Sequence, residues 1–206
     1  MTIYLHIFIA VAAFLFSGAR LQAAEIKYYG VDRGNPITDG NYAILSQHAV
    51  RTIIVDTDIN GGASLWQNIA NLAAKYNFNV VIWPSDWNST NWPNCGWEAP
   101  YVKNQPSDYI VKVKPLLDAI AGNPKVIGIV NAHEPFWSCL MTIQEMADIR
   151  TQLKDYVKSK FGRDIQVWNY VDNVAENRIS GTDIGRIMDV AVTWQHCFGG
   201  AEGTCD

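Results

Sequence analysis

The sequence lacks any dense cluster of lysine or arginine, and this narrows the partners it can have. It carries 16 Lys and Arg against 20 Asp and Glu over 206 residues, a formal net charge of −4. Nucleic acids and anionic membrane surfaces attract proteins with concentrated positive charge, so both are poor candidates. We expect no nucleic-acid partner, and the sequence shows no obligate protein partner.

Cofactor signatures are also absent. There is no Cys-x-x-Cys pair or His/Cys cluster of the kind that holds zinc. No Gly-x-Gly-x-x-Gly loop follows the first strand pattern, which argues against nucleotide binding. No segment after the first 24 residues is apolar for long enough to form a membrane helix. We therefore expect neither a cofactor nor a membrane span in the mature chain.

The first 24 residues have the pattern of a secretory signal peptide. An apolar core at 7–16 is followed by small residues from Ser17 to Ala24. The sequence thus predicts export to the extracellular space or the periplasm, with a single mature domain over 25–206.

Strand and helix patterns alternate along this domain. Runs rich in Val and Ile, typical of strands buried on both faces, predict strands at 26–31, 52–55, 80–83, 126–130, 165–170 and 190–194. Apolar residues at helical spacing predict helices at 64–76, 108–121, 143–161 and 184–188.

Helix-capping signals set some of these boundaries. Thr142 and Glu145 form a capping-box pattern that opens the longest helix, and Gly162 ends it. Ser107 is the expected N-cap of the helix at 108–121, within which Pro115 should cause a kink or shift the start.

This alternation predicts an α/β fold with a parallel sheet, either an open doubly wound sheet or a (β/α)8 barrel of the TIM type. The ends of the predicted strands favour the barrel, because each is followed by an acid, amide, His or Trp, as at a barrel's active face. A barrel needs eight units and about 250 residues. We therefore expect about six units of an incomplete barrel, with a complete six-stranded open sheet as the alternative.

The most informative stretch is Val126–Trp137, VIGIVNAHEPFW, where a buried strand runs into Glu134. Pro135 restricts the backbone of Glu134 to extended geometry and so helps to fix its carboxylate. Glu-Pro after a fourth strand resembles clan A of the glycoside hydrolases, where the Glu is the general acid/base. His133 in place of the more common Asn is closer to family 26, the mannanase-like branch, and family 5, the cellulase-like branch, is also compatible.

The resemblance implies a hydrolase of O-glycosyl bonds in a polysaccharide such as β-mannan or β-glucan. It assigns Glu134 as general acid/base and places the nucleophile on a seventh strand, outside this sequence. Other strand-end acids, at positions 32, 56, 58, 86 and 172, are more typical of caps, ligands for backbone amides or acceptors of sugar hydroxyls.

Aromatic side chains near strand ends suit a sugar ligand, because indole packs against the C–H face of a pyranose ring. The candidate substrate-binding residues are Trp83, Asp86, Trp87, Asn131, His133, Trp137, Tyr170, Trp194 and His196. Two alternative functions stay open: a non-catalytic secreted carbohydrate-binding barrel, and a muramidase-like hydrolase of cell-wall glycan, which Gly30-Val31-Asp32 faintly resembles.

Four cysteines in an exported chain suggest two disulfides. Three pairings are possible, and we favour Cys95 with Cys139 and Cys197 with Cys205. Asn88-Ser-Thr90 is an N-glycosylation sequon in a Trp-rich loop.

We predict that Cys95 and Cys139 are bonded, since both fall in loops that follow adjacent strands. Non-reducing peptide mapping should recover the two as one cross-linked species. Their replacement should lower the free energy of unfolding by about 2–5 kcal/mol, the usual cost in small secreted domains. Recovery of both as free thiols would contradict the pairing.

Overall fold

A computed structural model describes residues 30–32, 38–48, 50–86, 106–131, 141–171 and 181–193. The strands are β1 (Gly30–Asp32), β2 (Thr52–Asp58), β3 (Asn79–Ser85), β4 (Val126–Val130), β5 (Gln166–Val171) and β6 (Val190–Thr193). The helices are α2 (Asp39–Ser46), α3 (Ala63–Lys75), α4 (Pro106–Ile120), α5 (Ile143–Phe161) and α7 (Gly181–Ile187).

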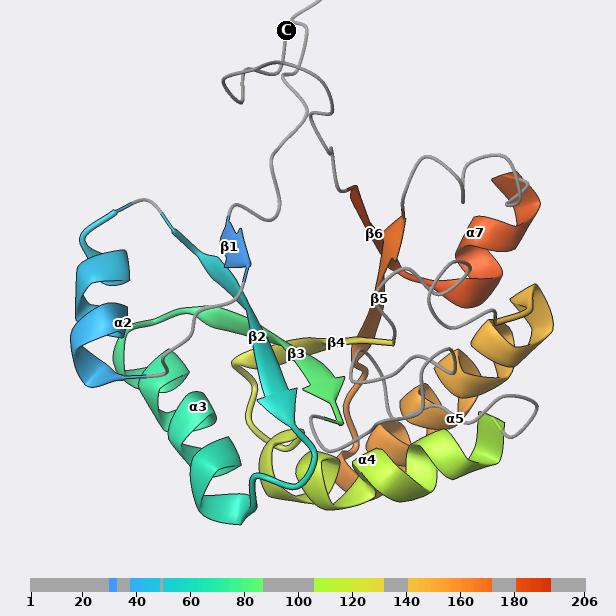
Figure 1. Cartoon of the computed structure of the whole chain (residues 1–206), viewed down its shortest axis with the longest axis horizontal. Coiled ribbons are helices and arrows are strands. Elements are labelled where there is room, and N and C mark those ends of the chain that lie inside the picture. The colour runs from blue at the N-terminus through green and yellow to red at the C-terminus, as the bar shows by residue number, and fades with distance from the viewer. Residues whose placement is uncertain are drawn as a thin grey trace, which may run out of the picture.

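The strands form one sheet in the order β1-β2-β3-β4-β5-β6, and every neighbouring pair is parallel. Right-handed crossovers that always step in the same direction place their helices on one face of the sheet. Figure 1 shows the helices around the convex side of the sheet, and residues from all five join one core with its strands. A doubly wound sheet would reverse its strand order part-way across. The α/β class is confirmed, and the strand order does not reverse within the described sheet, which has β1 and β6 at its two edges.

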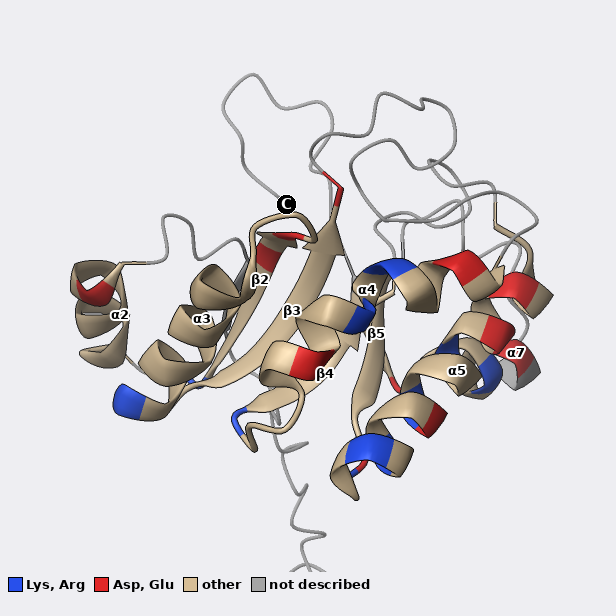
Figure 2. Cartoon of the chain, turned by 90° about the horizontal axis from the view of Figure 1, so that it is seen from below, with Lys and Arg blue, Asp and Glu red and all other residues tan. Residues whose placement is uncertain are grey.

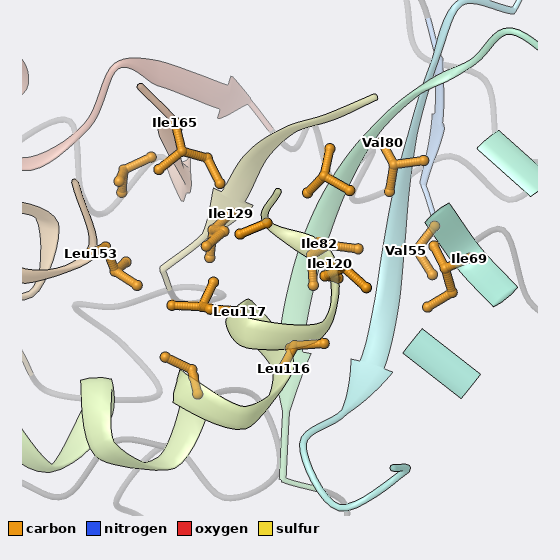
Figure 3. Close-up of a cluster of buried hydrophobic side chains, with 14 of the residues drawn as sticks. Val55, Ile69, Val80, Ile82, Leu116, Leu117, Ile120, Ile129, Leu153 and Ile165 are labelled. Atoms are coloured by element: carbon orange, nitrogen blue, oxygen red, sulfur yellow. The ribbon is translucent and has the colours of Figure 1, made fainter. Parts of the chain in front are cut away.

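The outer face of the sheet carries the main apolar core. Ile53 and Val55 of β2, with Val80 and Ile82 of β3, face the helices. Figure 3 shows Val55, Val80 and Ile82 of these strands near side chains of α3, α4 and α5; the residues labelled there are Val55, Ile69, Val80, Ile82, Leu116, Leu117, Ile120, Ile129, Leu153 and Ile165. A second, inner cluster lies on the opposite face and consists of Ile54, Val81, Trp83, Val130, Trp168 and Tyr170.

The strand β4 and the helix α5 match their predicted ranges. Thr142 Oγ1 accepts a hydrogen bond from the Glu145 amide at 3.1 Å, and the Glu145 carboxylate accepts one from the Thr142 amide at 2.8 Å, so the capping box is confirmed. Gly162 ends the helix with φ of 69°, a left-handed conformation that glycine adopts without strain.

Helix α4 begins at Pro106, two residues before the predicted start, so Ser107 lies inside the helix and is not its N-cap. Pro115 is accommodated in the helix interior. The carbonyl that Pro115 leaves without an intrahelical donor belongs to Val111, whose side chain is 68% exposed. Val111 thus lies on the solvent side of α4, where water can act as the partner of that carbonyl.

Other boundaries differ from those expected. The strands β2 and β3 extend to Asp58 and Ser85, three and two residues beyond their predicted ends. Helix α2 was not predicted, because only Tyr42 among its eight residues is buried and its apolar pattern is weak. Smaller shifts affect α3, β5, α7 and β6, and the predicted start of the first strand, at 26–29, lies outside the described residues.

Asp189, just before β6, connects three elements at the amino edge of the sheet. Its carboxylate accepts hydrogen bonds from Arg150 (2.6 Å) and Lys154 (2.9 Å) of α5 and from the backbone amide of Val167 (2.9 Å) in β5. Burial alone would raise the pKa of Asp189. The bonds from Lys154, Val167 and Arg150 outweigh that effect and hold the pKa below its ordinary value of 3.8.

We predict that Asp189→Asn lowers the free energy of unfolding by about 1–3 kcal/mol at neutral pH, the range for hydrogen bonds to charged groups. A lowered pKa in the folded state stabilises the protein above the ordinary pKa, and that stabilisation is lost as pH falls through the folded pKa. Urea titrations at a series of pH values measure the free energy of unfolding. The difference in this quantity between wild type and Asp189→Asn should shrink as the pH is lowered from neutral into the acidic range.

Asp164→Asn is the matched control. The Asp164 side chain is 78% exposed, and its ion pair with Lys158 measures 3.2 Å. Exposed pairs of this kind contribute about 0–1 kcal/mol. Equal effects of the two substitutions, or an Asp189→Asn effect independent of pH, would contradict the structural role of Asp189.

Candidate functional site

The carboxyl ends of β2 and β3 carry a group of acidic and hydroxyl side chains. Figure 2 shows acidic residues where these two strands end. The residues at this edge are Asp56 and Asp58 of β2, Ser85 at the end of β3, and Asp86 directly after it. In parallel barrels this is the edge where catalytic groups gather.

Asp56 and Ser85 form the inward-facing part of this group. Ser85 is fully buried, and its hydroxyl donates a hydrogen bond to Asp56 Oδ1. Asp56 lies opposite Trp83 in the β2–β3 ladder and shares the inner face with it. The carboxylate is therefore held directly above the apolar inner cluster, with one oxygen bonded to a serine.

Asp58 and Asp86 are connected by one amide. Asn60 Nδ2 lies 3.1 Å from Asp58 Oδ1 and 3.2 Å from Asp86 Oδ1, so it donates to carboxylates from two strands. The Asn60 backbone amide also donates to Asp58 Oδ1 at 3.0 Å. Nearby, the Asp58 carbonyl accepts from the Trp66 indole at 3.1 Å. This arrangement presents two carboxylates that can accept hydrogen bonds from hydroxyl groups.

The aromatic residues of the inner cluster lie beneath this edge. The rings of Trp83 and Tyr170 are 5.5 Å apart at an angle of 44°. Trp83 lies inside β3, not at its end, and is 0% exposed. Both Trp83 and Tyr170 were predicted to bind sugar, but their observed contacts are in the inner cluster. A ligand would reach either ring only if that packing opened.

Asn131 follows β4 and continues its ladder, because its backbone amide donates to the Trp168 carbonyl at 2.8 Å. Its side chain is 0% exposed, and neither amide atom has a hydrogen-bond partner among the residues described. Asn131 was predicted to contact a ligand from the rim of the site, but its side chain is buried. Tyr109, also buried, donates to the Val130 carbonyl at 3.4 Å, and burial raises the pKa of its phenol.

Several predicted residues lie outside the described part of the chain, and their roles stay predictions. These are Asp172, Glu134, Trp87, Asn88, His133, Trp137, Trp194, His196 and the four cysteines Cys95, Cys139, Cys197 and Cys205, together with residues 1–24.

Within the described ranges, no group of three or more His, Cys, Asp or Glu side chains is arranged to hold a metal ion. No helix in those ranges is both long enough and apolar enough to cross a membrane.

Two residues of the site were not predicted from the sequence. Ser85 reads as a loop residue after Pro84, but it is the last inward position of β3. Asn60 forms a local turn with Asp58, a pattern that the sequence Asp-Ile-Asn could have indicated. Its bond to Asp86, 26 residues away, depends on the pairing of β2 with β3.

No family model and no curated protein matches this chain. Among solved structures it is similar to a β-glucuronidase of Parabacteroides merdae, with a TM-score of 0.51 at 10% identity over 82% of this chain and 20% of that one. A β-glucuronidase of Bacteroides uniformis gives a TM-score of 0.47 at 11% identity, with coverages of 82% and 20%. A fructose-bisphosphate aldolase of Campylobacter jejuni gives 0.41 at 12%, with coverages of 73% and 44%.

At 10% identity, the likeness to the β-glucuronidase of Parabacteroides merdae is one of fold alone. It supports an α/β fold of the kind found in that β-glucuronidase. This chain spans about a fifth of the length of both β-glucuronidases.

The floor of the site depends on a glycine. A Cβ at Gly128 of β4 would lie 2.6 Å from Trp168 Nε1 and 2.8 Å from Trp168 Cδ1. The Trp168 indole is itself fixed by a 3.1 Å hydrogen bond to Gln166 Oε1. The inner face of β4 thus leaves space for the indole of β5.

We predict that Gly128→Ala lowers the free energy of unfolding by about 1–3 kcal/mol, the usual cost of overpacking. Tryptophan fluorescence should change as Trp168 moves. In the control Gly40→Ala, the new methyl group meets no atom within 4 Å. Because Gly40 lies in α2, that variant should be neutral or stabilised by up to about 1 kcal/mol. Equal stability of the two variants would show that the Gly128–Trp168 contact is unimportant.

Proposed function

We propose that this chain is part of a glycosidase that hydrolyses O-glycosyl bonds of a polysaccharide such as β-mannan or β-glucan, with Glu134 as general acid/base. The main support is the acid-bearing carboxyl edge of a barrel-type parallel sheet. The likeness of fold to a protein named as a β-glucuronidase agrees with it.

Chain geometry restricts where Glu134 can be. Glu134 is three positions after Asn131, whose backbone is bonded to β5 at the carboxyl end of β4. Three residues span at most about 11 Å, and this short reach supports the proposal that Glu134 acts at this edge of the sheet. The strand β4 directly neighbours β3, which brings Ser85 and Asp86 to the same edge.

Glycoside hydrolysis needs two carboxyl groups, about 5–5.5 Å apart for retention of configuration and about 6.5–9.5 Å for inversion. Glu134 would supply one. In the clan that the motif resembles, the second lies on a seventh strand. We propose that Asp58 and Asp86 instead accept hydrogen bonds from sugar hydroxyls, because their carboxylates already share an amide donor and lie at the edge.

The remaining proposals rest on the sequence. We propose that the polysaccharide is also contacted by residues in the sequence segments that follow β3, β4 and β6. These residues are Trp87, His133, Trp137, Trp194 and His196. From the sequence we also propose that the mature domain, 25–206, is exported and needs no cofactor. Within clan A, we propose that it belongs to family 26 or family 5.

We predict that Glu134→Gln in the whole natural protein reduces hydrolysis of the polysaccharide by about 10²-fold or more, the usual size of general acid–base catalysis. Binding should persist because the amide keeps the shape of the carboxyl group. An activated aryl glycoside should lose less activity in its first step, since its leaving group needs less protonation. Kinetics on both substrates, with binding measured by calorimetry, test this.

Glu145→Gln is the matched control. It makes the same chemical change, and Gln can keep the capping box of α5 that Glu145 forms. Its kcat should stay near that of wild type. If Glu134→Gln also hydrolyses the polysaccharide at the wild-type rate, Glu134 is not the acid. If the wild type binds the polysaccharide but cleaves none, the protein is a carbohydrate-binding barrel.

A further inference from the structure

Asn60 is followed by Gly61, and no other asparagine in the sequence precedes a glycine. In an Asn-Gly pair, the glycine nitrogen can attack the side-chain carbonyl of asparagine with little steric hindrance, because glycine has no Cβ. The pair lies in the turn after β2, and Asn60 is exposed to solvent. The asparagine of this reactive Asn-Gly pair is therefore the residue whose side chain bridges Asp58 and Asp86.

The packing around Gly61 leaves little room for a side chain at this position. A Cβ at Gly61 would lie 2.7 Å from Leu65 Cδ2 and 3.1 Å from the Asp58 carbonyl oxygen. Any larger residue at position 61 would displace Leu65 or the turn. The turn thus favours glycine for packing reasons, and the same glycine leaves the Asn60 side chain open to attack.

Three hydrogen bonds must break before the reaction can proceed. The Gly61 amide donates to the Asp58 carbonyl at 3.0 Å, and Asn60 Nδ2 donates to the Asp58 and Asp86 carboxylates at 3.1 and 3.2 Å. These bonds lie in an exposed turn, where each has water as an alternative partner. Opening of this turn alone frees both reacting groups, without global unfolding.

We propose that Asn60 is a modification site, at which spontaneous deamidation breaks the bridge between Asp58 and Asp86. The Gly61 nitrogen loses its proton and bonds to Asn60 Cγ, and ammonia leaves to give a cyclic succinimide. Water then opens the ring at either carbonyl and gives aspartate or isoaspartate at position 60. The net change consumes one water and releases one ammonia, with no oxidation or reduction.

The consequence follows from charge. The amide that donates to two carboxylates is replaced by a third carboxylate, which has no proton to donate at neutral pH. Like charges at this separation repel one another, and each opposes the ionisation of the others. The ends of β2 and β3 therefore lose their side-chain connection at the carboxyl edge. This inference does not depend on the proposed glycosidase activity.

The first experiment follows the reaction in the folded protein. The whole chain is incubated in mildly alkaline buffer, digested with trypsin under mildly acidic conditions, and analysed by mass spectrometry. Cleavage after Arg51 and Lys75 gives one peptide that contains Asn60, Asn68 and Asn71. We expect aspartate and isoaspartate to form at position 60, while Asn68 and Asn71, both in α3, stay unchanged as internal controls.

In Gly61→Ala, the added methyl group should slow the reaction several-fold. An intact Asn60 in the folded chain, under conditions where the denatured chain reacts, would show that the native turn blocks the reaction and would overturn the proposal. Equal modification of Asn68 or Asn71 would also overturn it.

The second experiment measures the consequence. Asn60→Asp should lower Tm at neutral pH by more than Asn60→Ala, which removes the donor without adding charge. The difference between the two variants should be about 2–4 °C, a typical shift for a change of modest size in a chain of this length. It should vanish in acid, where the three carboxyl groups are protonated. A Tm for Asn60→Asp equal to or above that of Asn60→Ala would overturn the predicted repulsion.

Discussion

The one-directional winding of the sheet is the constraint on which the rest of the structure depends. Because each strand is added on the same side of the previous one, all the helices in the described part of the chain pack on the same face. None of the described helices covers the opposite face, where the side chains of the inner cluster pack against one another. They do so with large rings, such as Trp83 on Tyr170, and with the close contact of Trp168 with Gly128.

The same constraint places the polar edge. Side chains that point inward recur at every second residue of a strand. Along the inner face of β2 the sequence changes from Ile54 to Asp56 and Asp58, and along β3 it changes from Val81 and Trp83 to Ser85. Towards their carboxyl ends, both β2 and β3 thus pass from an apolar layer to a layer of acidic or hydroxyl side chains. The site and the inner core are consecutive layers of one face.

This layering explains what the sequence predicted correctly and what it missed. The strand β4 was predicted at its observed bounds because it is apolar throughout, and α5 because its capping box and Gly162 mark both ends. The strands β2 and β3 were predicted too short because their last inward residues are polar and read as loop. The shared amide of Asn60 was not predicted, since Asp86 comes close only through strand pairing. Helix α2 was missed because a single buried side chain leaves no periodic signal.

Helix polarity adds a last contribution at this edge. The crossover helices α4, α5 and α7 follow strand ends, so their first turns belong to the carboxyl side of the sheet. An isolated helix N-terminus carries partial positive charge and attracts anions. Each of these three helices has an acid in its first turn, Asp108, Glu145 and Asp183, whereas α3, which follows β2, has none. These three acids offset the dipoles of their own helices. Together with Asp56, Asp58 and Asp86, they make this edge of the sheet negatively charged, so it does not attract anions. Such an edge suits a neutral ligand rich in hydroxyl groups better than a phosphate.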